Sequence, residues 1–190
     1  YEQVRYLANK DLGFSGEQVL EISYYKPKTV FNDKNYEQKQ FARYTTIKNE
    51  IYKIAGVVQV ATGAFRFGGG NDSSSSFSYH DVNIQGQNIA VDFGQLEMMK
   101  IEMAQGRYLD PKIASDTINS MMVNETALAM MNEKNPIDKI VNWNDKKLKI
   151  VGVVKDFSLF SPQGKVPPMV FFHFKTVDWM VQNLNTIYVK

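Results

Sequence analysis

The fold is decided by residues 148–157, which read LKIVGVVKDF. Residues 148–154 are nearly continuously apolar, which is typical of a β-strand covered on both faces, and residues 169–174 have the same character. Gly152 lies inside the first run and indicates that another backbone passes close to it. Asp156 follows the run and is suited to accept backbone N–H bonds where the strand turns away. These features predict a sheet with buried strands.

The chain before this sheet is predicted to open with a strand, a helix and a second strand. Leu20, Ile22 and Tyr24 alternate with polar residues, as in a half-buried strand. A helix is expected over residues 36–55, ending before Gly56, and a strand over residues 57–62. A further helix is expected over residues 1–10. The apolar positions that support the 36–55 helix follow one another at steps of three or four: Phe41, Tyr44, Ile47, Ile51, Ile54 and Ala55.

The next part of the chain is predicted to be a linker followed by β-rich structure. Residues 66–76 are rich in glycine and serine, a composition typical of a flexible linker. The alternation of apolar residues changes phase at His80–Asp81, which predicts a bulge or a strand break. Gln85–Gly86 is predicted to be a turn.

Two short helices are predicted further along the chain. Apolar spacing from Leu96 to Met103 indicates one helix, which Gly106 would end. Asn124 is predicted to cap the other helix, which would run through Met131 and be blocked from continuing by Pro136.

The composition excludes several classes of protein. Of the 190 residues, 44% are hydrophobic and 22% are charged, which is an ordinary globular balance. The net charge is +2, and acidic neighbours dilute the lysines at 146–149, so no nucleic-acid partner is expected. The absence of cysteine excludes disulfides and thiolate chemistry. No apolar run approaches the ~18–20 residues that cross a bilayer. Because the chain opens on Tyr1 without a signal peptide, we expect a fragment of a longer protein.

Residues suited to catalysis are sparse. Ser73–Ser76, His80 and Asp81 could be combined into a hydrolase site, but no Gly-x-Ser-x-Gly motif surrounds the serines. The glycines at 68–70 lack the Lys-Ser/Thr of a phosphate-binding loop, and the two histidines and scattered carboxylates do not show metal-ligand spacing. We therefore predict no catalytic residue, no cofactor and no metal. A secreted hydrolase built on the serines and a ligand-binding sensor domain are the alternatives.

Five short sequence segments, called phrases below, contain no catalytic or ligand-binding motif but occur in a distinctive order. They are residues 9–14 (NKDLGF), 105–109 (QGRYL), 123–127 (VNETA), 135–139 (NPIDK) and 150–157 (IVGVVKDF). In order and spacing they resemble the extracytoplasmic, or periplasmic, domain of MacB/FtsX-type ABC transporter permeases, in the version found in Bacteroidetes-like bacteria. One departure is Asp138, which stands where that family usually has glycine, so a different turn geometry is expected there.

The resemblance implies an α+β fold with two lobes. Residues 1–65 plus 176–190 would form a porter-like βαβ lobe, truncated at its C-terminal end, and residues 77–175 an inserted β-rich lobe, with 66–76 as the linker. It also implies a domain on the periplasmic side of the cell inner membrane that couples ATP-driven transmembrane movement to export or to a periplasmic partner. The implied partners are a separate cytoplasmic ABC ATPase domain or subunit, a second permease copy or homologue, and a periplasmic adaptor.

The motif residues are predicted to serve the fold. Arg107 is expected to bind a carboxylate or backbone carbonyls beside Gly106, and Glu125 to lie favourably at a helix N-terminus. A candidate partner-contact loop is formed by Phe67, Phe77 and Tyr79. The structural motif residues are Gly106, Arg107, Asn124, Glu125, Pro136, Gly152 and Asp156.

Overall fold

The computed structural model describes residue 13 and residues 15–23, 35–63, 73–159, 164–177, 180–181, 184 and 186–190. Its elements, in chain order, are β1 (Leu20–Ser23), α2 (Tyr36–Tyr52), β2 (Val60–Gly63), β3 (Ser74–Tyr79), β4 (Val82–Val91), α3 (Gln95–Met98), β5 (Met103–Gly106), a 3₁₀ helix (Ala114–Thr117), β6 (Ser120–Asn124), α4 (Glu125–Met131), β7 (Ile140–Trp143), β8 (Lys146–Val154), β9 (Met169–His173) and β10 (Thr186–Val189). The fold is therefore mixed α+β, as predicted.

Six strands close on themselves into a ring. Around this closed sheet β4 pairs with β3, which is followed by β7, β8, β6 and β9, and β9 pairs back with β4. The β4–β9 and β6–β8 pairs are parallel and the other four are antiparallel. β5 is added alongside β8. Closing a sheet in this way leaves its strands without an open edge.

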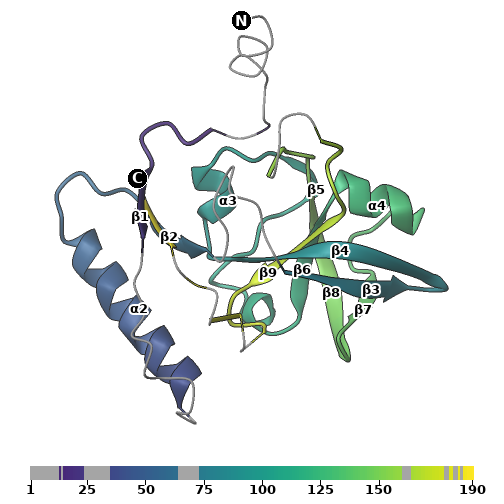
Figure 1. Cartoon of the computed structure of the whole chain (residues 1–190), viewed down its shortest axis with the longest axis horizontal. Helices are drawn as coiled ribbons and strands as arrows, with labels where there is room; N and C mark the ends of the chain where they lie inside the picture. Colours follow the sequence, from purple (N-terminus) through teal and green to yellow (C-terminus); the bar gives the residue numbers. More distant parts are fainter. Residues whose placement is uncertain are drawn as a thin grey trace, which may run out of the picture.

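Three further strands and helix α2 lie to one side of the closed sheet. β10 runs between β1 and β2 and is antiparallel to both, so β1 and β2 point in the same direction. A single residue pair, Gly63 with Val91, joins β2 to β4. Helix α2 packs Tyr44 into the same core cluster as Val60 and Ile187 of these strands. Figure 1 shows α2 and α4 at opposite sides of the molecule.

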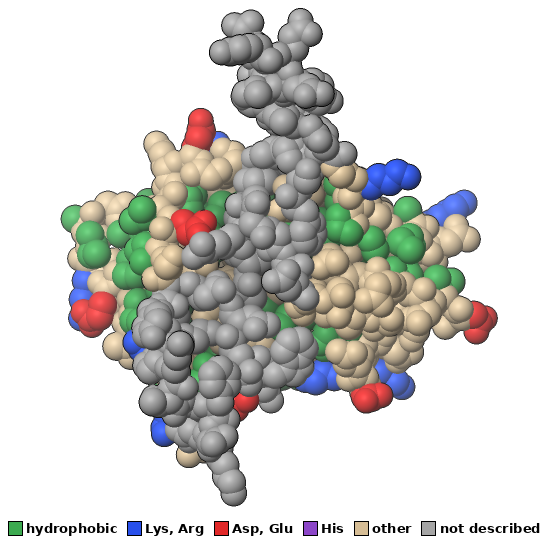
Figure 2. Space-filling model, viewed as in Figure 1, with side chains coloured by type: hydrophobic (Ala, Val, Ile, Leu, Met, Phe, Trp, Pro, Cys, Tyr) green, Lys and Arg blue, Asp and Glu red, His purple; other side chains and the backbone are tan. Residues whose placement is uncertain are grey.

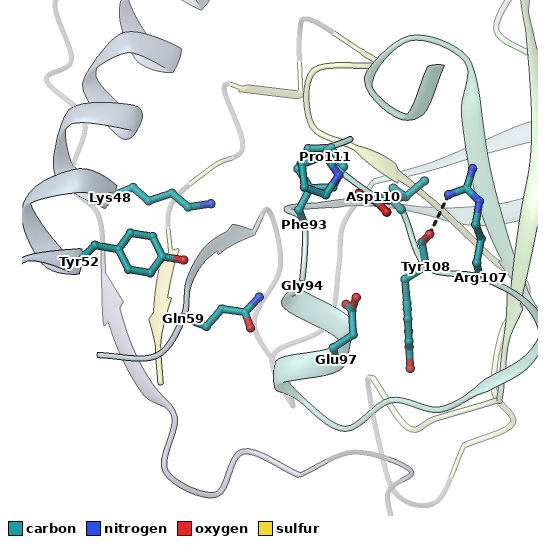
Figure 3. A pocket seen from close by; sticks show the side chains of 11 residues that line it. Lys48, Tyr52, Gln59, Phe93, Gly94, Glu97, Arg107, Tyr108, Asp110 and Pro111 are labelled. Atoms are coloured by element: carbon teal, nitrogen blue, oxygen red, sulfur yellow. Dashed lines mark hydrogen bonds between the residues drawn. The ribbon is translucent and has the colours of Figure 1, made fainter. Parts of the chain in front are cut away.

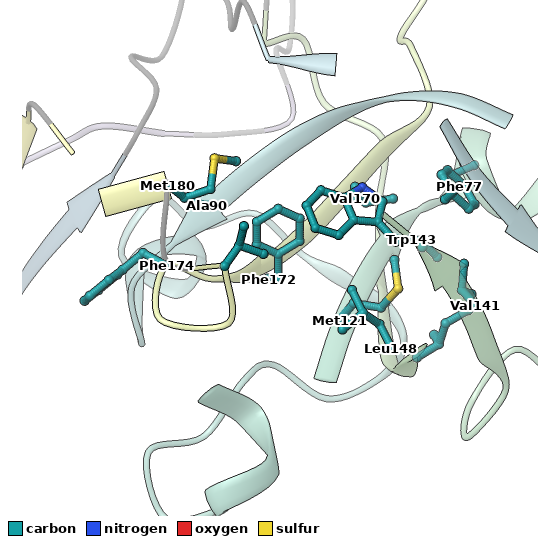
Figure 4. Packing of buried hydrophobic residues seen from close by; sticks show 14 of the residues in the cluster. Phe77, Ala90, Met121, Val141, Trp143, Leu148, Val170, Phe172, Phe174 and Met180 are labelled. Carbon is teal, nitrogen blue, oxygen red and sulfur yellow. The ribbon is translucent and has the colours of Figure 1, made fainter. Parts of the chain in front are cut away.

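β8 is buried on both faces, which confirms the prediction for residues 148–154. On one face Leu148 packs with Trp143 and Phe172 in a core cluster (Figure 4). On the other face Val151 and Val154 belong to a second cluster. Each fully buried large apolar side chain contributes about 1.5–3 kcal/mol, so this strand supports two hydrophobic cores at once.

Other elements predicted from hydrophobic periodicity are present and are of the predicted type. The buried strand expected at 169–174 is β9, whose five residues are all buried. His80–Asp81 forms the turn between β3 and β4, as the predicted strand break requires. α2 begins at the predicted residue and ends at Tyr52, with Gly56 (φ +90°) in the turn beyond.

The prediction of a half-buried strand near residue 20 is only partly right. β1 is present, but Leu20 is 61% exposed and Ile22 38% exposed, because β1 is the outermost strand of the described sheet. Hydrophobic side chains also show at the left edge of Figure 2, over the turn that follows α2, where Ile54 and Val58 are exposed. Tyr24 and the helix expected over residues 1–10 lie outside the described residues.

The prediction of a flexible linker that reaches residue 76 is wrong for the last three serines. Ser74, Ser75 and Ser76 form the start of β3 and pair with Gln85–Gln87 of β4. Their hydroxyls take part in side-chain hydrogen bonds with β4, among them Ser75 Oγ to Asn88 Oδ1 at 2.9 Å. A long partner strand thus gives regular structure to residues of low intrinsic strand preference. Residues 66–72 lie outside the described part of the chain.

A predicted turn and the predicted length of a helix are also wrong. Gln85–Gly86 lies inside β4, where a Cβ on Gly86 would come within 3.2 Å of the Phe77 ring, so the glycine makes room for packing. The helix expected from Leu96 to Met103 ends early, because Lys100 takes up a left-handed conformation (φ +56°) and Met103–Gly106 becomes β5.

Helix α4 ends at Met131, before Pro136 is reached. Asn132 adopts the left-handed conformation (φ 52°) that commonly terminates a helix. Pro136 is buried in the turn that leads to β7, so it does not itself end the helix. In the described part of the chain, no helix is both long enough and apolar enough to cross a membrane.

Candidate functional site: a groove between helix α2 and the closed sheet

The motif residues meet around β8. A Cβ atom on Gly152 would collide with the backbone carbonyl of Arg107 and with the Met103 side chain, and one on Gly106 would collide with the carbonyl of Val151. Gly106 also has φ +70°, a conformation that favours glycine. The two glycines let β5 and β8 approach closely. This confirms the close approach predicted at Gly152 and shows that the predicted role of Gly106 as a helix end is wrong.

A hydrogen-bonded knot joins the start of α4 to the end of β8. Buried Asn124 caps the helix by accepting a bond from the Ala127 N–H at 3.0 Å, and its amide donates to Asp156 at 2.7 Å. Asp156 also accepts bonds from the backbone N–H and the hydroxyl of Thr126. Glu125 accepts a bond from the Asp156 N–H at 3.0 Å. The predicted cap and the predicted backbone acceptor are therefore confirmed, and they belong to one network.

Two further phrases reach the same strand. Gly13 lies so close to Asp156–Phe157 that an added Cβ would come within 2.9 Å of the Phe157 Cβ. Asp138 donates its N–H to the carbonyl of Ile150 at 2.8 Å. Asp138 has φ +66°, in the region that favours glycine, so the different turn geometry expected from an aspartate at this position is not seen. The other four ordered phrases thus contact the fifth, residues 150–157, which forms the end of β8 and the residues just after it.

Arg107 binds a buried carboxylate, as predicted. Its two terminal nitrogens donate to the two oxygens of Asp116, one at 2.5 Å and the other at 3.0 Å. Burial acts to raise the pKa of Asp116, but the hydrogen bonds from Arg107 outweigh it and hold that pKa below its ordinary value. The same bonds raise the pKa of Arg107. The pair fixes the segment that leaves β5 against the 3₁₀ helix.

The predicted partner-contact loop is wrong for two of its three residues. Phe77 is 1% exposed and Tyr79 is 5% exposed, so neither side chain is available to a partner. The Tyr79 hydroxyl donates to Glu133 at 2.6 Å, and this bond raises the pKa of Tyr79 to about 12. Phe67 lies outside the described residues.

The serines do not form the rigid site that a hydrolase requires. Ser75 Oγ bonds to Asn88, and Ser76 Oγ bonds to Gln85 at 2.9 Å. The His80 ring packs against the Tyr79 ring at a centroid distance of 4.2 Å. A nucleophilic serine needs a base held against its hydroxyl, whereas these hydroxyls serve the pairing of β3 with β4.

A groove of about 560 Å³ lies between α2 and the segment that follows β5. Lys48 and Tyr52 of α2 point toward it from one side, and Glu97 and Tyr108 line the other side (Figure 3). Phe93 forms part of its lining between them. The volume falls within the roughly 300–1,000 Å³ typical of ligand sites. No sequence motif indicated this groove, because its lining comes from segments that are far apart in the chain.

Next to the groove, buried Asp92 connects α2 with the closed sheet. Asp92 follows β4 directly and is 4% exposed. Its carboxylate accepts hydrogen bonds from the Tyr44 hydroxyl, from the Lys48 ammonium at 3.0 Å and from the Thr62 N–H at 3.2 Å. The Nε2 atom of His173, at the end of β9, lies 3.6 Å from Asp92 Oδ1. One carboxylate therefore contacts α2, β2 and β9.

The charges of this cluster follow from burial and from mutual contacts. Burial acts to raise the pKa of Asp92, but His173 and the charge of Lys48 outweigh it and lower that pKa, so the carboxylate is ionised. Burial lowers the pKa of His173, and Asp92 only partly opposes the effect, so the imidazole is neutral at pH 7. A buried anion with one cation and several hydrogen-bond donors is adequately compensated.

Two solved structures with a similar fold are extracytoplasmic parts of transporters. The chain is similar to the periplasmic region of MacB from Actinobacillus actinomycetemcomitans, with a TM-score of 0.63, 16% identity, and coverage of 97% of this chain and 79% of that one. It is also similar to the extracellular domain of the noncanonic ABC-type transporter YknZ from Gram-positive bacteria, with a TM-score of 0.59, 14% identity, and coverage of 90% and 83%. The chain thus has the fold of these transporter domains.

The sequence gives a narrower assignment. Residues 8–190 match the family model of the MacB-like periplasmic core domain, and the chain belongs to this family. It is the periplasmic domain of a MacB/FtsX-like ABC transporter permease, which confirms the resemblance carried by the five ordered phrases. A comparison with curated protein sequences gave no match.

Proposed function

We propose that this domain couples ATP-driven movement of the membrane part of a permease to export or to a partner in the periplasm. The observation that carries the proposal is the family match over residues 8–190. We assign ATP hydrolysis to a separate cytoplasmic ATPase domain or subunit, because the motif residues described above serve capping, ion pairing and close backbone contact.

The domain would act as two lobes that share few backbone pairs between their strands. We assign residues 1–65 plus 176–190 to one lobe and residues 77–175 to the other. Among the described strands, the Gly63–Val91 pair joins β2 to β4, and the Asp92 cluster lies beside it. A joint with few backbone pairs can change its angle at lower cost than a continuous sheet. This supports a movement of α2 relative to the closed sheet.

The proposed surroundings are the periplasmic side of the inner membrane, with an ABC ATPase, a second permease copy or homologue, and a periplasmic adaptor as partners. Location can be tested with Asp81→Cys, since the chain has no cysteine of its own and residue 81 is exposed. In intact cells that produce the full-length permease, with every cysteine outside these 190 residues replaced by serine, a membrane-impermeant maleimide is expected to label this variant and not the cysteine-free parent. Labelling only after cell lysis would contradict the assignment.

Coupling can be tested by measuring distances between spin labels in the full-length permease with its ATPase. One pair, Glu50→Cys with Asn132→Cys, reports on α2 relative to the closed sheet, and the control pair, Asp81→Cys with Asn132→Cys, stays within the closed sheet and α4. Trapping the ATPase with ATP and vanadate is expected to shift the first distance distribution and leave the second unchanged. An unchanged first distribution in a transporter that hydrolyses ATP would overturn the proposed movement.

A further inference from the structure

The charges that line the groove between α2 and the segment after β5 are unequally compensated. Two cations line it, Lys48 and Arg107. Lys48 is bound to Asp92 at 3.0 Å, and Arg107 is bound to Asp116 at 2.5 Å. Both of these carboxylates are buried and lie outside the lining. The two cations are therefore already neutralised by the protein itself.

Two carboxylates line the same groove without such a partner. Glu97 and Asp110 belong to the lining, and no Lys or Arg in the described part of the chain forms an ion pair with either. Asp110 accepts a bond from the Lys112 N–H at 2.8 Å and lies close enough to Arg107 for the two charges to attract, so Glu97 is the less compensated of the two carboxylates. Partial burial raises the pKa of Glu97 above its ordinary value, although the residue remains exposed at the surface and thus accessible to a ligand. The groove thus carries an excess of negative charge that a cationic ligand would satisfy.

Aromatic side chains accompany these carboxylates. Tyr52, Phe93 and Tyr108 all line the groove, and Figure 3 shows Tyr108 beside Glu97. The Tyr108 hydroxyl donates to the carbonyl of Ile101, which holds the ring in place. Fixed aromatic rings bind apolar groups and attract cations to their faces. A ligand that carries both apolar groups and a positive charge therefore fits this lining.

From these contacts we infer that the groove binds an extended polypeptide segment of a partner protein, with a Lys or Arg side chain placed against Glu97. The volume of about 560 Å³ exceeds what one side chain fills, and the two walls come from different elements, so a chain can run between them. The Gln59 amide points toward the groove and can bond to the backbone of such a segment (Figure 3). The inference concerns binding by this domain and does not depend on the proposed coupling role.

The test uses the 190-residue chain and synthetic peptides of nine residues with alternating Leu and Ser and one central position. Binding is measured by isothermal titration calorimetry with Lys, Arg, norleucine or Glu at that position. We expect the Lys and Arg peptides to bind at least tenfold more tightly than the norleucine peptide, and binding to weaken as salt is raised. Equal binding of all four peptides, or no binding of the Lys and Arg peptides at millimolar concentration, would overturn the inference.

Two variants test whether the peptide contacts Glu97. Glu97→Gln keeps the shape of the side chain and is expected to reduce Lys-peptide affinity about tenfold, which corresponds to ~1.4 kcal/mol. Glu50→Gln removes the same charge from the solvent side of α2, where Glu50 pairs with Lys53, and is expected to leave affinity unchanged. Equal effects of the two variants would place the peptide elsewhere. A small amine, n-butylammonium, that bound as tightly as the Lys peptide would overturn the polypeptide as ligand.

Discussion

The knot at the end of β8 and the junction at Asp92 hold the molecule together in different ways. In the knot, Asn124 and Asp156 bond to each other and to backbone groups, and beside the knot Gly152 allows the backbone of β8 to contact the backbone of Arg107 directly. In the junction, the Asp92 carboxylate contacts side chains from α2 and β9, next to the single residue pair that joins β2 to β4. Backbone contacts leave little room for adjustment, whereas side-chain contacts can rearrange. We therefore expect the knot to set global stability and the junction to set the attachment of α2.

The largest effect is expected from Gly152→Val, which would test the rigidity of the close backbone contact beside the knot. The new side chain meets the Arg107 carbonyl, which belongs to backbone and cannot move aside, so the variant should lose about 3 kcal/mol of unfolding free energy. Urea unfolding measures the loss. Gly16→Ala is the matched control, since nothing lies within 4 Å of a Cβ there. Equal stability of the two variants would contradict the role assigned to Gly152.

Asn124→Ala should cost slightly less, about 2.5 kcal/mol. The change removes the α4 cap, deprives Asp156 of one of its three hydrogen-bond donors and leaves the buried Met169 N–H without its partner. Hydrogen exchange should show faster exchange in α4 and β8 together, because both ends of the knot are released. Asn119→Ala removes an exposed amide and should leave both unchanged. Faster hydrogen exchange that is confined to α4 would mean that the knot does not extend to β8.

Asp92→Asn should cost about 2 kcal/mol and should act mainly on α2. The amide retains an acceptor for Tyr44 or Thr62, and Lys48, whose side chain is 23% exposed, can turn to solvent. Hydrogen exchange is expected to become faster in α2 and to stay unchanged in β8. Asn124→Ala, in contrast, is expected to make exchange faster in β8. Lys48→Met should give a smaller loss, since Tyr44 and Thr62 keep their bonds. Uniform destabilisation of α2 and β8 would remove the distinction between the two regions.

The smallest effect is a dependence on pH that belongs to the junction. Because burial lowers the folded-state pKa of His173, the unfolded chain takes up a proton near the ordinary pKa of 6.5 that the folded chain does not. Stability should therefore fall as the pH drops below about 6.5, by at most ~1.4 kcal/mol per pH unit. His173→Gln should flatten this part of the profile. An unchanged slope would show that another group causes it.

Local signals allowed much of the knot to be predicted. The apolar run of residues 148–154, the glycine inside it and the Asn124 cap each follow from a few neighbouring residues. The junction could not be predicted in this way, because Asp92 and His173 have no local pattern and meet only when β4 and β9 pair in parallel. The strand at Ser74–Ser76 was missed for the same reason: its pairing with β4, and not the preference of serine, makes it regular.

The position of β10 imposes an order on folding. β1 and β2 do not pair with each other but with β10, so residues 186–189 must be present before that part of the sheet can form. A chain that emerges from its N-terminus would therefore hold residues 20–63 without their partner strand until synthesis has passed residue 189. Contacts between residues so far apart in sequence form slowly. During this interval the unpaired edges of residues 20–63 would be open to pairing with other chains.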